Sequence, residues 1–98
     1  LTQAGIEVDE TLWRMPLSEA YDKMIDSKVA DMKNLAGRHG GSITAAQFLQ
    51  RYVGKTPWAH IDIAAVVLTE TDKPVVPEGA TAFGVRLLDR LVKNHYEN

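Results

Sequence analysis

The pair His60 and Asp62 is the first candidate for chemistry in this sequence of 98 residues. Residues two apart on a strand point to the same face, so the two side chains could form an acid–base pair or bind a metal. Zinc takes three or four ligands, and nothing nearby supplies a third. The interpretation we favour is therefore a satisfied polar pair that anchors the strand.

The glycine-rich segment 37–41 (Gly-Arg-His-Gly-Gly) is a second candidate, because it precedes a predicted helix. It could cradle an anion, with Arg38 and His39 adding positive charge. Its spacing matches neither a dinucleotide fingerprint nor a phosphate loop, so a tight turn with positive φ is favoured. Ser42 reads as a helix cap and not as a nucleophile, since no Gly-x-Ser-x-Gly motif surrounds it.

Several charged and aromatic residues have plainer interpretations. Asp26, Lys28, Asp31 and Lys33 alternate in sign, which is typical of a solvated charge ladder and favours it over a catalytic group. Trp13 and Trp58 are expected to pack in the core or at an interface.

The hydrophobic pattern predicts the elements that would position these residues. Strands are expected over residues 12–17, 29–35 and 58–68, and helices after Ser18, over 42–53 and over about 81–96. The predicted apolar helix stripes are Ala45, Phe48, Leu49 and Tyr52, and then Val85, Leu88, Leu91, Val92 and His95. Alternating strands and helices indicate an α/β fold of two or three layers, with about three mostly parallel strands in one domain over 1–98.

Composition excludes several classes of function. The net charge of −2 argues against nucleic acid as a partner. The longest apolar run, 63–68, is far shorter than the roughly 20 residues of a membrane-spanning helix. No cysteine is present, so disulfides and thiolate chemistry are excluded, and a cytoplasmic location is expected.

Five blocks of the sequence resemble consecutive motifs of the leucine aminopeptidase family, most closely its bacterial members. They are LWRMPL at 12–17, SKVADMKN at 27–34, GRHGGSITAAQFL at 37–49, PWAHIDIA at 57–64 and GAT with FGVRLL within 79–88. The resemblance implies a segment of the catalytic-domain sheet of a cytosolic metallo-exopeptidase that removes N-terminal residues from peptides. It also implies a parent with two divalent ions, zinc or manganese, that assembles as a hexamer.

The same resemblance implies a limited role for this segment. The family's metal-binding and catalytic motifs do not occur here, so no metal ligand or catalytic residue is expected in this chain, which should be inactive alone. Ala64 and Val67 match positions that line the family's pocket for the substrate side chain. The expected partners are the remainder of the aminopeptidase chain in the parent and, for the isolated chain, further copies in a homo-oligomer.

Three departures from the family pattern suggest redesign. The family usually has glycine where this chain has Ala36, Ala65 and Ala82, and such changes stabilise where φ allows. The chain also begins at Leu1 without an initiator methionine. We therefore expect an excised, engineered subdomain, with a divergent natural sequence as the alternative. A stand-alone, self-associating module without enzymatic function is the second functional hypothesis.

Overall fold

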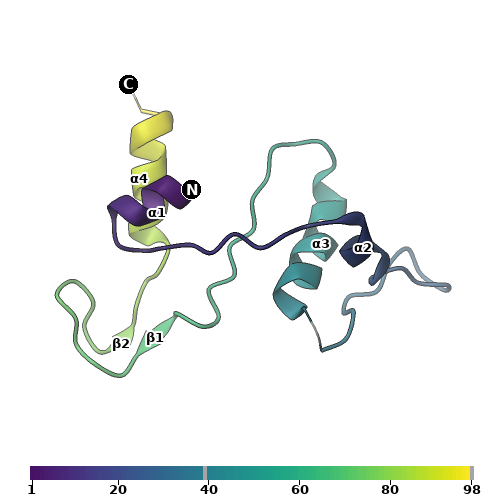
Figure 1. Ribbon diagram of the computed structural model, residues 1–98, viewed down its shortest axis with the longest axis horizontal. Helices are drawn as coiled ribbons and strands as arrows, with labels where there is room; N and C mark the ends of the chain where they lie inside the picture. Colours follow the sequence, from purple (N-terminus) through teal and green to yellow (C-terminus); the bar gives the residue numbers. More distant parts are fainter. Residues whose placement is uncertain (39, 98) are drawn as a thin grey trace. The chain divides into compact units, whose positions relative to one another are not determined.

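The structure, a computed structural model, describes residues 1–38 and 40–97 (Figure 1). Contacts group the chain into two compact units. Unit 1 consists of residues 1–14 and 62–98, and unit 2 consists of residues 15–61. Each unit buries its own small set of side chains, so each is described separately. The sequence-based expectation of one domain over 1–98 stays a prediction.

Unit 1 is built on two helices that pack together, α1 (Thr2–Glu7) and α4 (Val85–His95) (Figure 1). Ala4 and Gly5 form the buried face of α1, and Leu87 on α4 has no exposed surface. A six-residue helix is too short to be stable alone, so α1 depends on this packing.

A short hairpin completes unit 1. Strand β1 (Leu68–Thr69) pairs antiparallel with β2 (Gly79–Ala80), with Leu68 opposite Ala80 and Thr69 opposite Gly79. Within the described part of the chain, the sheet consists of these two strands. The prediction of about three mostly parallel strands is therefore not confirmed.

Local hydrogen bonds explain why two of the predicted strands do not form. In segment 29–35, the Ser27 hydroxyl accepts the backbone N–H groups of Val29 and Ala30, which takes them away from any ladder. In segment 58–68, Val66 N–H donates to the Ile63 carbonyl at 3.0 Å and closes a turn, so only Leu68 is in a strand. Segment 12–17 runs without strand pairing, and its Trp13 is 86% exposed, so core packing was the wrong interpretation for Trp13.

Unit 2 contains α2 (Glu19–Lys23), packed on α3 (Gly41–Val53). Ser18 is the N-cap of α2 as predicted, but its hydroxyl makes no capping bond. Its backbone N–H instead donates to Oε1 of the buried Gln47 at 3.0 Å, which ties the start of α2 to α3. Ile25, just after α2, is fully buried.

Helix α3 differs from its prediction at its start and in its buried face. Its N-cap is Gly40 and not Ser42, because the Gly40 carbonyl already accepts the N–H groups of Ile43 and Thr44. The helix ends at Val53, before Gly54 at φ 66°, as predicted. Its buried residues are Ile43, Thr44, Ala46 and Gln47, whereas Leu49 and Tyr52 of the predicted stripe are exposed. Four of the five residues of the predicted stripe on α4 are likewise exposed, namely Val85, Leu88, Val92 and His95.

Replacing Ala82 by glycine should make the folded chain more stable. Among the described non-glycine residues, positive φ occurs at Asp9 and at Ala82, where it is 52°. An alanine in the left-handed region is strained by about 1–2 kcal/mol, so the stabilising interpretation fails at this site. We expect Ala82→Gly to stabilise the chain by about 0.5–1 kcal/mol in urea unfolding, after the added freedom of the unfolded state is counted.

The other two alanines serve as controls for Ala82, because neither has positive φ. Ala36→Gly and Ala65→Gly should each destabilise by about 0.5–1 kcal/mol. A lower urea midpoint for Ala82→Gly as well would contradict the assignment of strain to this residue.

Candidate functional site

The two residues predicted to line a substrate pocket lie on one turn of unit 1. Ala64 is at its start, and Val67 directly follows it and precedes β1. Both side chains are exposed, Val67 by 37%. The turn is held from within by two bonds of 3.0 Å, from Ala64 N–H to Asp62 Oδ1 and from Val66 N–H to the Ile63 carbonyl.

Thr81 connects this turn to the segment that leads into α4. Its backbone N–H donates to the Val67 carbonyl at 2.9 Å, and its hydroxyl donates to the Val66 carbonyl at 2.5 Å. The same hydroxyl accepts the Phe83 N–H at 3.2 Å. Sequence reasoning missed this role, because Val66 and Val67 lie far from Thr81 along the chain, and Phe83 shares only a loop with it.

A cavity of about 410 Å³ lies beside the turn, within unit 1. Its walls include Glu10, Val66, Leu68, Thr81, Phe83 and Arg86. Neither Ala64 nor Val67 lines it, so the structure does not bring the two predicted site residues into this cavity.

Glu10 is the buried charged centre of unit 1, with 4% of its surface exposed. Its carboxylate accepts the backbone N–H of Gly84, the N-cap of α4, and pairs with Arg86 Nε at 3.2 Å. A carboxylate at a helix N-terminus is favoured by the helix dipole as well as by the hydrogen bond. Sequence reasoning missed this centre, because Glu10 lies in a mixed polar segment far from residue 84.

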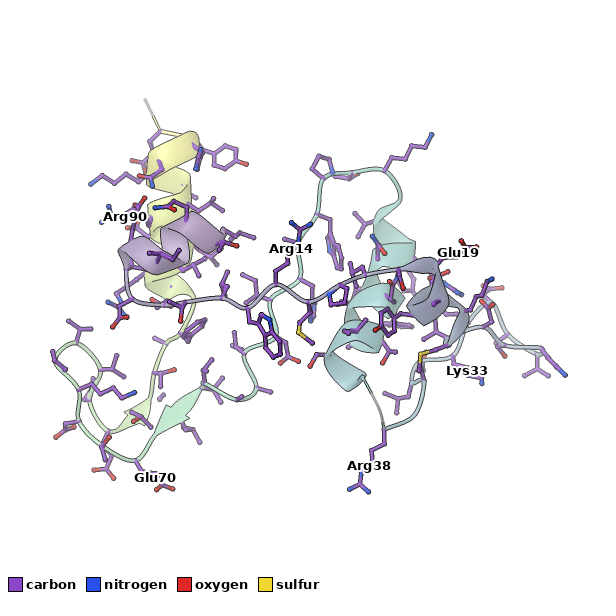
Figure 2. The ribbon with its side chains drawn as sticks, viewed as in Figure 1. Arg14, Glu19, Lys33, Arg38, Glu70 and Arg90 are labelled. Atoms are coloured by element: carbon purple, nitrogen blue, oxygen red, sulfur yellow. The ribbon has the colours of Figure 1, made fainter. Side chains whose placement is uncertain are left out.

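Glu7 makes a second, more exposed link between α1 and α4. Asn94 Nδ2 donates to Glu7 Oε2 at 3.0 Å, and Arg90 Nη1 lies 3.4 Å from the same oxygen (Figure 2, where Arg90 is labelled). The hydrogen bond from Asn94, with smaller contributions from Gln3 and Arg90, lowers the pKa of Glu7 below its usual value. This carboxylate therefore stays ionised and serves as an anchor.

Arg51 on α3 is the charged centre of unit 2. It makes a two-point contact with the Asp22 carboxylate at 2.9 and 3.1 Å and also bonds Asp26 at 2.7 Å. The hydrogen bonds to Asp22, and then those to Asp26, raise the pKa of Arg51, so the guanidinium stays charged. Asp26 is thus a partner of Arg51 and not only part of a solvated ladder.

Among the described residues, the remaining candidates from the sequence gather in no group that could bind a metal ion. Gly37 and Gly40 have φ of 101° and 62°, which confirms the turn interpretation, while His39 lies outside the described residues. The ring of His60 lies 6.2 Å from that of Trp58, and His60 belongs to no strand.

The described donor residues do not fit a metal centre. Over residues 1–38 and 40–97, no three histidine, cysteine, aspartate or glutamate side chains gather in a group that could bind a metal ion. In the same two stretches, no helix is both long enough and apolar enough to cross a membrane.

Comparison with known proteins decides the family. A family model described as "Cytosol aminopeptidase family, catalytic domain" matches residues 1–89. The chain belongs to the cytosol aminopeptidase family. A relative from Nitrobacter winogradskyi, named "Probable cytosol aminopeptidase", is 61% identical over 97 residues, which are 99% of this chain and 19% of the relative. Another of the same name, from Allorhizobium ampelinum, is 59% identical over 99% of this chain and 20% of its own length.

A solved structure agrees with the family assignment. The crystal structure of the cytosol aminopeptidase from Coxiella burnetii is 37% identical and matches with a TM-score of 0.83. The match covers 97% of this chain and 21% of the Coxiella chain. The chain therefore spans about a fifth of the length of the aminopeptidases that it matches.

Proposed function

We propose that the chain is the C-terminal part of the catalytic domain of a metal-dependent leucyl aminopeptidase, which removes N-terminal residues from peptides in the cytoplasm. The observation that carries this proposal is the match of the catalytic-domain family over residues 1–89. In this proposal the chain supplies part of the substrate pocket and not the reacting groups.

Ala64 and Val67 are the residues proposed to contact the substrate side chain. Both carry small apolar side chains, and both are exposed at one turn, where a substrate could reach them. An apolar wall suits leucine, because burial of a leucine side chain contributes about 1.5–3 kcal/mol to binding.

The metal ions of the proposed enzyme are held outside these 98 residues. The family resemblance implies two divalent ions, zinc or manganese, but the described residues offer no group that fits them. When bound, such a pair would activate water for attack on the peptide bond. The chain alone is therefore proposed to be inactive.

Exposed apolar residues support a partner for this chain. Val85, Leu88 and Val92 follow helical spacing on α4, and they are 65%, 46% and 43% exposed. We propose that this stripe packs against the remainder of the aminopeptidase chain. Without that cover, the isolated chain should form homo-oligomers, because apolar patches seldom stay exposed on monomers. Self-association of this kind also fits the proposal that the chain is an engineered fragment.

A chimera tests the proposed function. In it, this chain replaces the 97 matching residues of the Nitrobacter winogradskyi relative. We expect the chimera to hydrolyse leucine p-nitroanilide with added manganese or zinc, whereas the 98-residue chain alone should not. The 98-residue chain alone should sediment as a homo-oligomer. A chimera that folds and binds metal but shows no hydrolysis would contradict the proposal, and a 10.9 kDa species at high micromolar concentration would contradict self-association.

A further inference from the structure

The turn that carries Ala64 and Val67 cannot be held by the packing of its own side chains. The side chains from Ala64 to Val67 are all exposed. Its internal bonds fix the first part, since they involve the N–H groups of Ala64 and Val66. The carbonyls of Val66 and Val67 need hydrogen-bond donors from another segment. Without them the peptide planes on either side of Val67 could rotate and change the direction of its side chain.

Thr81 supplies those partners with its backbone and its side chain together. Its N–H donates to the Val67 carbonyl at 2.9 Å, and its hydroxyl donates to the Val66 carbonyl at 2.5 Å. The hydroxyl also accepts the Phe83 N–H at 3.2 Å, so its one donor and one of its two acceptor lone pairs are used, which favours a single rotamer.

Thr81 is itself anchored to the buried part of unit 1. Phe83 leads directly into Gly84, whose N–H is bound by the Glu10 carboxylate, and Glu10 is 4% exposed. The exposed turn is thus connected through Thr81 to the buried carboxylate of Glu10.

We infer that Thr81 is a positioning residue that sets the specificity of the substrate pocket by fixing the carbonyls of Val66 and Val67. This inference rests on the proposed function, in which Val67 lines that pocket. Thr81 need not contact the substrate. Its hydroxyl holds the backbone so that the Val67 side chain keeps one place in the pocket wall.

The test compares three variants of the chimera described above. Thr81→Val keeps the shape and the backbone N–H but removes the hydroxyl, and Thr81→Ser keeps the hydroxyl. Thr69→Val is the matched control, because the Thr69 hydroxyl also donates to one backbone group and accepts from another, both in Thr71, away from the turn.

We expect Thr81→Val to lower the preference for leucine over alanine p-nitroanilide, as the ratio of kcat/KM, by about fivefold. Amide exchange in the peptide that contains Phe83 should also become about fivefold faster. Thr81→Ser and Thr69→Val should keep the original preference. An unchanged preference in Thr81→Val would overturn the inference, as would an equal loss in Thr69→Val.

The exchange measurement separates the two proposals. A chimera without any peptidase activity would overturn the proposed function and, with it, the role of Thr81 in specificity. Faster amide exchange at Phe83 in Thr81→Val alone would then still support the role of the Thr81 hydroxyl in holding the turn. Unchanged amide exchange would overturn that role, whatever the peptidase activity.

Discussion

Replacing Gly5 by alanine should destabilise unit 1 by about 2–3 kcal/mol, because the added Cβ has no room. That atom would lie 2.4 Å from the Glu10 carbonyl oxygen and 3.2 Å from Leu87 Cδ1. The carbonyl cannot move cheaply, since the Glu10 N–H is bonded to the Gly5 carbonyl at 2.8 Å and its carboxylate is held by α4. Alanine gains about 1 kcal/mol of helix propensity, which the collision outweighs.

Gly41→Ala is the matched control for Gly5→Ala. Gly41 also lies in a helix, α3, but a Cβ there would meet nothing within 4 Å. This change should leave stability unchanged or raise it by up to about 1 kcal/mol. The measurement is urea unfolding followed by circular dichroism. Equal midpoints for the two variants would show that α1 does not pack on Glu10 and Leu87 as described.

Replacing Glu10 by alanine should cost about 3 kcal/mol, by leaving a buried N–H without its acceptor and opening a small cavity. The Gly84 N–H at the start of α4 would lose the carboxylate, and Arg86 would lose its partner. The estimate is at the low end of the range for breaking a buried ion pair, because Arg86 is 41% exposed and can turn to water.

Two further variants make the Glu10 prediction specific. Glu10→Gln keeps an oxygen that can accept the Gly84 N–H, so it should recover part of the loss. Glu7→Ala removes the other carboxylate that pairs with an arginine of α4, and it should cost much less, because exposed ion pairs contribute little. If Glu7→Ala lowered the urea midpoint as much as Glu10→Ala does, burial would not be the reason for the effect.

Local signals in the sequence were sufficient for the start of α2, the end of α3 and the glycine turns. Ser18 marks the start of α2, and Gly54 ends α3 with positive φ, because capping depends on neighbouring residues. The family was also evident, since the five motif blocks resemble it and the family model matches residues 1–89.

The strands and the charged centres could not be predicted in the same way. A strand needs a second strand, and segments 12–17 and 29–35 form no ladder with any other described residue. Each of Glu10 and Arg51 acquires its role from residues far along the chain, Gly84 for one and Asp22 for the other. No spacing rule reports such long-range pairs. The buried faces of α3 and α4 were misjudged for the same reason, since the apolar stripes show which residues can be covered and not what covers them.

The division into two units has a consequence for synthesis on the ribosome. Residues 15–61 interrupt the sequence of unit 1, so α1 is made well before α4, its packing partner. Unit 2 can therefore complete its contacts before α1 has a packing partner. Six residues do not form a stable helix in water by themselves. The interruption costs little free energy, because loop-closure entropy rises only slowly with loop length. Unit 1 is thus the later of the two to close, because α1 cannot pack on α4 until α4 has been made.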